Sequence, residues 1–298
     1  MPELPEVETM RRGVEPVVGA KILVAERLAC PRKPIAITPG LAAFRRRVEG
    51  ARIALTGRAG KRVVLWLDRG DALVFEPRMT GLLLLDEPPD PLYSRFRLRL
   101  RGGAAKQLLY WDRRGLGNVR LFSERQFNEH FGLDRLGPDA LDMTAELYRE
   151  RLGQSQRAIK VALLDQRAVA GIGNLYASEI LYLAGVHPAR ACRQLTVSQW
   201  QSIADAALEV LETAIRYEGS TLGDGTYRNA LNKEGGYQNV HRVYAKAGEP
   251  CPRCPGRIIE RMVQAQRSTF FCRRCQKRTG KSQIIRVGST SPSLAGRG

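Results

Sequence analysis

The sequence has no long apolar run and comparatively few acidic residues. No stretch approaches the ~20 apolar residues of a membrane-spanning helix, so we expect no membrane-embedded segment. The 30 Asp and Glu residues are outnumbered by 48 Lys and Arg residues, which gives a net charge of +18 and a pI of about 10.2. Such an excess favours a polyanionic partner, nucleic acid first and an acidic membrane surface second.

We also expect no secretory leader, and the sequence shows neither internal repeats nor an even spread of cysteines. It begins with an acidic, proline-bearing segment instead of a basic region followed by an apolar one, so we expect an intracellular, cytoplasmic protein. Four of its six cysteines form two pairs near the C-terminus. In a reducing compartment, this arrangement indicates a metal site and not disulfides.

What the chain does contain is a change of pattern along its length. Its 298 residues are enough for two domains, and 43% of them are hydrophobic. A helix is expected over residues 5–18, then a β-rich region in which residues 95–101 alternate strictly between Arg and apolar side chains. Thr38 and Ser123 are expected to cap short helices. Later patterns are helical, and a glycine-rich loop follows them over 219–240. The later helices are expected at about 144–152, 156–165, 174–184 and 196–218.

The two cysteine pairs are the most specific chemical signal. Seventeen residues separate Cys251-x-x-Cys254 from Cys272-x-x-Cys275, a spacing that supplies four tetrahedral ligands to one Zn²⁺. Four thiolates leave no position for a reactive water, so the zinc is expected to be structural. Residues 241–286 carry 12 Lys/Arg and 2 Asp/Glu, a net charge of +10, which favours phosphate binding over an ordinary solvated surface.

The first eight residues, Met-Pro-Glu-Leu-Pro-Glu-Val-Glu, carry the second signal. Removal of Met1 would expose the secondary amine of Pro2, which stays partly unprotonated near neutral pH because α-amino pKa values lie near ~8. Such an amine forms an iminium with a sugar C1′, and Glu3 beside it is a possible proton carrier. Pro5 is expected as the first residue of a helix. Taken alone, Met-Pro-Glu is also an ordinary start of a chain.

A third segment, residues 164–179, places two glycines and Asn174 before an amphipathic helix. Asn174 can cap that helix while backbone N–H groups face an anion. From these residues alone, an ordinary helix–turn–helix corner is an equal alternative.

Together, the first eight residues, residues 164–179 and the segment Gln266–Cys272 resemble the formamidopyrimidine-DNA glycosylases, bifunctional base-excision enzymes. The resemblance runs to about residue 286. It implies an α+β fold with an N-terminal β-sandwich domain and flanking helices, then a helical domain with a helix–two-turn–helix and a zinc-finger β-hairpin. The expected boundaries are 1–132, 133–240 with the lesion-covering loop, 241–287 for the zinc finger, and a disordered tail over 288–298.

The resemblance also assigns roles to individual residues. It implies Pro2 as the nucleophile, Glu3 as the proton carrier and Lys61 as a catalytic residue near the phosphate of the damaged nucleotide. It implies that further residues hold DNA or fill the gap left by the extruded base. These DNA-binding residues are Lys160, Asn174, Arg267, Met79, Arg114 and Leu116.

Three positions depart from the family pattern. Glu76 stands where the family has a phosphate-binding His, and a carboxylate there is expected to repel phosphate. Gly115 replaces a basic residue, and Leu116 replaces a Phe wedge, although leucine is also a known wedge residue. We therefore expect slower lesion search and weaker discrimination of intact purines, with the chemistry at Pro2 preserved. Glu76→His and Leu116→Phe are each expected to tighten binding to lesion DNA.

The resemblance implies a glycosylase for oxidised purines, with β,δ-elimination at abasic sites, acting as a monomer on double-stranded damaged DNA. Two alternatives stay open. One is a glycosylase/lyase of the same fold for oxidised pyrimidines or abasic sites, and the other is a non-catalytic protein that binds damaged DNA. Borohydride trapping separates enzyme from binder, because only a Schiff-base enzyme becomes covalently linked to DNA.

Overall fold

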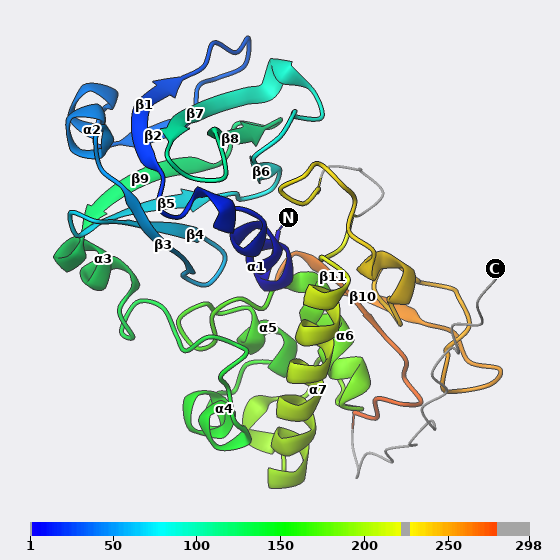
Figure 1. Cartoon of the computed structure of the whole chain (residues 1–298). Coiled ribbons are helices and arrows are strands. Elements are labelled where there is room, and N and C mark those ends of the chain that lie inside the picture. The colour runs from blue at the N-terminus through cyan, green and yellow to red at the C-terminus, as the bar shows by residue number, and fades with distance from the viewer. Residues whose placement is uncertain (1, 222–226, 279–298) are drawn as a thin grey trace, which may run out of the picture.

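The computed structural model describes residues 2–221 and 227–278, and Figure 1 shows an upper β-rich lobe and a lower helical lobe with helix α1 between them. Two sheets form the upper lobe, with strand orders β1-β7-β8-β6 and β2-β9-β5-β4-β3. All neighbours are antiparallel except the parallel pair β2 and β9. The strands are β1 Lys21–Arg27, β2 Ala36–Thr38, β3 Ile53–Arg58, β4 Val63–Leu67, β5 Asp71–Glu76, β6 Gly81–Leu84, β7 Ser94–Arg101, β8 Gln107–Asp112 and β9 Asn118–Ser123.

The alternating segment of β7 shows how this sandwich is built. Its apolar side chains, Phe96, Leu98 and Leu100, are buried in the core between the sheets, as alternation predicts. The opposite face is not uniformly exposed, because the Arg95 side chain is buried and its Nε donates to the Asp112 carbonyl oxygen at 2.7 Å. The prediction of an α+β fold with an N-terminal sandwich is confirmed, although one of the four arginines lies inside.

Three helices flank the sandwich: α1 Leu4–Gly13, α2 Leu41–Val48 and α3 Glu124–Phe131. Helix α1 starts at Leu4, one residue before the predicted start at Pro5, and a 3₁₀ turn over Glu15–Val17 follows it. The prediction that Thr38 caps α2 is wrong, because Thr38 ends strand β2 and Gly40 is the N-cap. Ser123 does cap α3 as predicted, in a capping box with Gln126.

The lower lobe contains helices α4 Ala145–Leu152, α5 Ile159–Leu163, α6 Asn174–Leu183 and α7 Val197–Arg216. Helix α7 starts with a capping box of Thr196 and Gln199 and packs against α1, α4 and α6. Helix α5 is shorter than the predicted 156–165. Further short 3₁₀ turns lie at Pro91–Tyr93, Cys192–Gln194 and Tyr237–Val240.

Two later segments complete the fold. Strands β10 Glu260–Gln264 and β11 Arg267–Phe271 form a hairpin beside α6. Within the predicted loop 219–240, Tyr227 and Ala230 are buried in the sandwich core. Residues 222–226 and the predicted disordered tail, 288–298, lie outside the described residues. Among the described helices, none is long and apolar enough to cross a membrane.

Candidate active site and nucleic-acid interface

The N-terminal end of α1 meets the N-terminal end of α6, and Glu3 joins them. The buried Glu3 carboxylate accepts hydrogen bonds from the backbone N–H groups of Leu175 at 3.0 Å and Tyr176 at 3.4 Å. The prediction that Asn174 caps α6 is therefore wrong: Gly173 is the N-cap residue, and the capping anion is Glu3. A Cβ atom on Gly173 would lie 2.2 Å from Glu3 Cδ, so this approach requires glycine.

Glu6 holds the other side of this junction. Its carboxylate accepts from the Glu3 backbone N–H at 2.8 Å, from the Ser220 N–H at 2.9 Å and from the Tyr176 hydroxyl. Burial raises the pKa of Glu6 above its usual range, although the Tyr176 hydrogen bond opposes that shift. Sequence patterns did not single out Glu6 for this role, because two of its three partners, Tyr176 and Ser220, lie 170 and 214 residues away.

Pro2 and Lys61 lie at the same junction. Pro2 is buried immediately before α1, and the first helical residue, Leu4, donates its N–H to the Gly171 carbonyl oxygen at 3.1 Å. Lys61, in the turn between β3 and β4, donates from Nζ to the Ile172 carbonyl oxygen at 2.8 Å. Burial lowers the pKa of Lys61, while the nearby Glu3 carboxylate opposes the shift.

The predicted phosphate-binding residues of the lower lobe form a connected chain. The Lys160 ammonium donates to Asn174 Oδ1, and Asn174 Nδ2 donates to the Ser268 carbonyl oxygen at 3.0 Å. Ser268 follows the exposed Arg267 at the start of β11. Burial, followed by the positive charge of Arg267, lowers the pKa of Lys160 to about 8. Three separate elements thus bring cationic or amide groups to one place beside Glu3.

Arg58 is a residue of this region that sequence reasoning missed. Its guanidinium bonds Glu8 of α1 at 3.1 Å through Nε and Asp139 at 3.0 Å through Nη2. The side chain is almost entirely buried. Arg58 belongs to β3, and Asp139 lies before α4, the first helix of the lower lobe. These ion pairs therefore connect the sandwich to the helical lobe close to Lys61. No local pattern indicates partners so distant in sequence.

Met79, Arg114 and Leu116 lie on the connections that leave β5 and β8. Arg114 Nη1 lies 3.0 Å from Met79 Sδ, and both Met79 and Leu116 are exposed. Buried Asp112 shapes this loop, because its carboxylate accepts from the backbone N–H of Arg114 at 3.1 Å and of Gly117 at 2.8 Å. Gly115 has φ +64°, a left-handed conformation that favours glycine.

Glu76, expected to repel phosphate, is buried inside a cluster of arginines. Its carboxylate lies 3.2 Å from Arg62 Nη2, 3.2 Å from Arg78 Nε and 3.4 Å from Arg120 Nη2. Asn118 Nδ2 also donates to it at 3.0 Å. Burial raises the pKa of Glu76, but Arg62, Asn118, Arg78 and Arg120 outweigh that effect and hold the pKa below its usual range. The carboxylate is outnumbered locally by cations.

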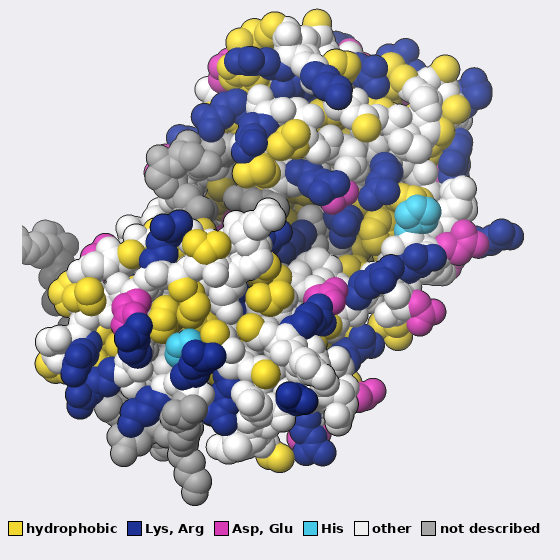
Figure 2. Space-filling view, turned by 180° about the vertical axis from the view of Figure 1, so that it is seen from behind, with side chains coloured by type: hydrophobic (Ala, Val, Ile, Leu, Met, Phe, Trp, Pro, Cys, Tyr) yellow, Lys and Arg dark blue, Asp and Glu magenta, His cyan; other side chains and the backbone are white. Residues whose placement is uncertain are grey.

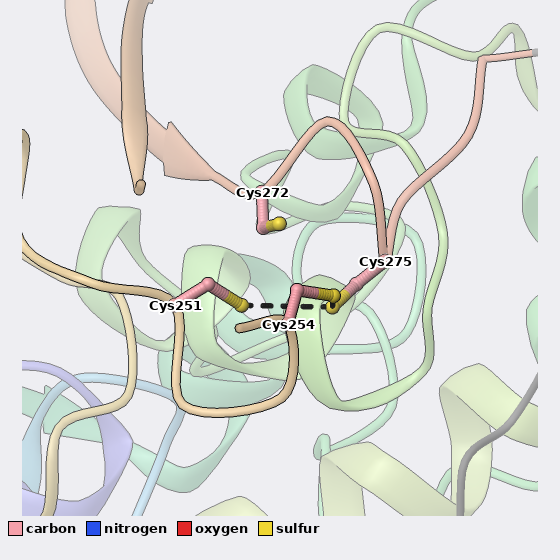
Figure 3. Close-up of side chains that lie close together, drawn as sticks. All are labelled: Cys251, Cys254, Cys272 and Cys275. Carbon is pink, nitrogen blue, oxygen red and sulfur yellow. Dashed lines mark hydrogen bonds between the residues drawn. The ribbon is translucent and has the colours of Figure 1, made fainter. Parts of the chain in front are cut away.

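The four predicted zinc ligands converge. The sulfur atoms of Cys251, Cys254, Cys272 and Cys275 all lie within 4.8 Å of one another (Figure 3). Cys251 Sγ and Cys275 Sγ are 3.7 Å apart, close to the edge of about 3.8 Å expected for a tetrahedron with Zn–S bonds of ~2.3 Å. Four thiolates fill the coordination of Zn²⁺, so this is a structural zinc site, as predicted.

Buried polar side chains attach the zinc finger to α6 and the segment after it. The Glu179 carboxylate accepts from the backbone N–H groups of Arg242 and Val243 at 2.9 Å and of Tyr244 at 2.8 Å. Beyond the last ligand, Gln276 Nε2 donates to the Val186 carbonyl oxygen at 3.0 Å. These contacts fix the position of the hairpin that carries Arg267.

The surface agrees with the charge excess of the sequence. Figure 2 shows Lys and Arg side chains on both lobes and around the hollow between them, with fewer acidic side chains on this face. A polyanion can therefore contact cations from both lobes at once.

Three family models match the chain in succession. The formamidopyrimidine-DNA glycosylase N-terminal domain matches residues 1–119, the formamidopyrimidine-DNA glycosylase H2TH domain matches 136–225, and the zinc finger found in FPG and IleRS matches 248–278.

Individual relatives agree with these matches. The chain is 42% identical over 282 residues to the formamidopyrimidine-DNA glycosylase of Chloroflexus aggregans, covering 93% of this chain and 98% of the relative. It is 38% identical over 281 residues to the Streptococcus mutans enzyme of the same name, covering 93% and 100%.

Solved structures extend the match to the fold. The MutM (Fpg) protein of Thermus thermophilus has a TM-score of 0.80 and 37% identity, covering 94% of this chain and 100% of that one. The Lactococcus lactis Fpg in complex with DNA that contains an abasic site has a TM-score of 0.80 and 35% identity, covering 92% and 99%. The chain therefore belongs to the formamidopyrimidine-DNA glycosylase family.

Proposed function

We propose that this protein is a base-excision repair DNA glycosylase that removes oxidised purines, 8-oxoguanine and formamidopyrimidines, and then cleaves the abasic site. The observation that carries the proposal is the junction at Glu3, where Pro2, Lys61 and the Lys160–Asn174 pair converge. The related Lactococcus lactis Fpg has been solved with abasic-site DNA, and a mutant of it with Fapy-dG DNA, which supports this substrate class.

Pro2 is the proposed nucleophile. After removal of Met1, the lone pair of its secondary amine attacks C1′ of the extruded nucleotide. The N–C1′ bond forms as the bond to the damaged base breaks, and the base leaves with the bonding electrons and takes up a proton. The base must first leave the helix stack, because its C1′ is inaccessible to a protein nucleophile inside the duplex.

Glu3 is the proposed proton carrier at the sugar. It can deliver a proton to the ring oxygen as the sugar opens and the nitrogen–C1′ bond becomes an iminium. The iminium acidifies the C2′ proton, whose loss expels the 3′ phosphate by β-elimination. A second, δ-elimination then expels the 5′ phosphate, and hydrolysis of the imine regenerates the amine.

The remaining predicted residues hold the DNA in this geometry. We propose that Lys61, Lys160, Asn174 and Arg267 contact backbone phosphates around the extruded nucleotide. On the connections that leave β5 and β8, Met79 fills the space left by the base, Arg114 pairs with the orphaned base and Leu116 wedges the stack. Zinc has no proposed chemical step and keeps the Arg267 hairpin in place.

One chain supplies every residue of this site, so we propose that the protein acts as a monomer, on double-stranded DNA in the cytoplasm, where thiolate ligands stay reduced. We also propose the domain division 1–132, 133–240 and 241–287. Separate hydrophobic cores in the sandwich and among the helices support it, although Tyr227 and Ala230 of the second segment pack into the first core.

Borohydride trapping on duplexes that carry 8-oxoguanine or an abasic site tests this proposal. Wild-type protein lacking Met1 should become covalently linked to both duplexes, and Pro2→Gly should sharply reduce trapping and base excision. Protein that retains Met1 should not trap at all. Full trapping by protein whose mass spectrum still shows Met1 would rule out Pro2. Absence of trapping by the wild type would indicate a non-catalytic binder, and preference for oxidised pyrimidines would indicate a different lesion class.

A further inference from the structure

We propose that Arg78 binds a phosphate of the DNA backbone, and that Glu76 is a positioning residue that holds Arg78 for this contact. The proposal rests on the proposed function, since it assigns a further contact to the same DNA. It also reverses the role expected for Glu76 from the sequence, where its charge indicated repulsion of phosphate.

The first argument is the balance of charge around Glu76. Three guanidinium groups, those of Arg62, Arg78 and Arg120, lie within 3.4 Å of one carboxylate. One negative charge cannot neutralise three positive ones, so the cluster keeps an excess of about two positive charges. The Glu76 carboxylate also reduces the electrostatic repulsion among the three guanidinium groups, so that they can lie close together.

The three arginines are not equivalent. Arg62 lies over the Phe131 ring at 5.2 Å, and Arg120 lies over the Phe122 ring at 5.3 Å, so aromatic faces hold both. The Nε atoms of both are buried and lack a hydrogen-bond partner among the described residues. Arg78, in contrast, has a side chain that is 57% exposed. It is therefore the member of the cluster best placed to meet a ligand in solvent.

The backbone conformation at Arg78 restricts the direction of its side chain. Its φ of +54° lies in the left-handed region, which is unusual for a residue with a Cβ atom. The surrounding turn maintains this conformation, because the Gly81 N–H donates to the Pro77 carbonyl oxygen at 2.9 Å. The Tyr110 hydroxyl also donates to the Glu76 carbonyl oxygen at 3.0 Å.

The position of Arg78 identifies the ligand. The next residue is the exposed Met79, which contacts Arg114 of the same edge. Arg78 Nε lies 3.2 Å from Glu76 Oε1, and the Arg78 side chain is more than half exposed, so the guanidinium can meet a second anion from the solvent side. A guanidinium held at one side by a carboxylate and presented to DNA at the other is suited to a phosphate, which it can bind through two parallel hydrogen bonds.

The test compares Arg78→Ala with Arg99→Ala. Arg99 is a matched control because its side chain is 58% exposed and also pairs with a glutamate, Glu26, on strand β1. Affinity for lesion duplex is measured at several salt concentrations. Arg78→Ala should weaken binding roughly 5- to 20-fold and reduce the slope of log K against log salt by about 1. Arg99→Ala should leave both quantities within about twofold, and Arg78→Lys should restore the slope but only part of the affinity.

A double-mutant cycle tests the role of Glu76. If Glu76 positions Arg78, the loss caused by Arg78→Ala should be several-fold smaller in a Glu76→Gln background than in wild type. Neither Glu76→Gln nor Glu76→His should tighten binding to lesion DNA. Thermal unfolding of each variant checks that it is folded, and Glu76→Gln, which keeps the side-chain size, serves if Glu76→His does not fold.

The outcomes separate this inference from the proposed function. A wild-type protein that fails to trap would refute the proposed function, whatever Arg78 does. A trapping wild type whose affinity and salt slope are unchanged by Arg78→Ala would overturn the inference alone. Tighter binding by Glu76→Gln, with an undiminished effect of Arg78→Ala in that background, would return Glu76 to the role of a repelling charge.

Discussion

Glu3 and Glu76 are both buried carboxylates, but the protein stabilises them in different ways. Glu3 accepts hydrogen bonds from backbone amides at the start of α6. Glu76 is surrounded by three arginine side chains. Amide dipoles fix a carboxylate without placing a full positive charge on it, whereas guanidinium groups bring an excess of cations to the surface. The Glu3 region is accordingly suited to proton transfer, and the Glu76 region to holding a polyanion.

The two regions also differ in how closely they follow the family pattern. The motifs around Pro2, Glu3 and Asn174 match it, whereas Glu76, Gly115 and Leu116 depart from it. In the second region, three neighbouring arginines offset the negative charge of Glu76. The residue at position 76, considered alone, would suggest a negative site, because the effect of the neighbouring arginines would be missed.

The largest effect on activity is expected from Gly173→Ala, which changes a residue in contact with Glu3. The new Cβ would lie 2.2 Å from Glu3 Cδ, so the carboxylate must leave the N-terminus of α6. We expect single-turnover excision to fall by ~100-fold or more, as displacement of reacting groups by about 1 Å can cause. Gly40→Ala is the matched control, since nothing lies within 4 Å of its added Cβ. Normal excision by Gly173→Ala would contradict the claim that catalysis requires Glu3 to cap α6.

A smaller but still large effect is expected from Cys272→Ser. This variant distinguishes the two regions, because the zinc finger contacts the Glu3 region. The finger contacts Asn174 of the Glu3 region through the Ser268 carbonyl oxygen, so loss of a zinc ligand should displace Arg267 and lower DNA affinity about tenfold or more. Metal analysis should give one zinc per wild-type chain and less in the variant. Cys30→Ser is the control. A wild type purified without zinc would contradict this prediction.

A change of pH is expected to have a moderate effect on DNA affinity, and this effect should arise in the Glu3 region alone. Lys160 has a pKa of about 8 in the free protein, and its protonated form is the one that attracts phosphate. Affinity for DNA should therefore fall several-fold as the pH rises from about 7 to about 9, whereas arginines stay charged throughout. Lys160→Arg should flatten much of this dependence, leaving the part due to Lys61. An unchanged pH profile in that variant would exclude Lys160.

The smallest effect is expected from Leu116→Phe, in the second region. Leu116 is exposed, and an aromatic ring there would stack on a base, a contact worth ~1–3 kcal/mol by alanine substitution. Because leucine already provides apolar contact, we expect only about two- to fivefold tighter binding to lesion duplex, measured by titration. Weaker binding by this variant would mean that the loop has adapted to leucine and that the enzyme serves a different lesion.

Much of the fold followed from local patterns, but strands β2 and β3 did not. Strand β2 has only three residues and pairs with β9, which lies about 80 residues later. In β3, a shift in register between Ile53 and Leu55 interrupts the alternation and leaves Leu55 exposed. Periodicity cannot reveal a strand whose alternation is broken or whose partner is distant.

In the candidate site too, local patterns predicted some features, whereas others depend on contacts between distant segments. Motifs predicted Pro2 and Glu3 as site residues and identified the four zinc-binding cysteines, because all of them are recognisable from their neighbours in sequence. The Glu3–Leu175 hydrogen bond and the Arg58–Asp139 ion pair depend on how distant segments meet, and no spacing rule supplies that information. Glu76 is the clearest case, since its effect on charge depends on Arg62 just before β4, Arg120 in β9 and Arg78 in the turn after β5.

The central claim is that the chemical step depends on the Glu3 region, whereas the Glu76 region contributes to DNA binding alone. It is tested most directly by the rate of borohydride trapping on saturating abasic duplex, measured side by side for Glu3→Gln and Arg78→Ala. The account predicts that Glu3→Gln slows trapping by orders of magnitude, while Arg78→Ala slows it far less and shows its loss in affinity. Equal slowing by both variants, or undiminished trapping by Glu3→Gln, would contradict the account.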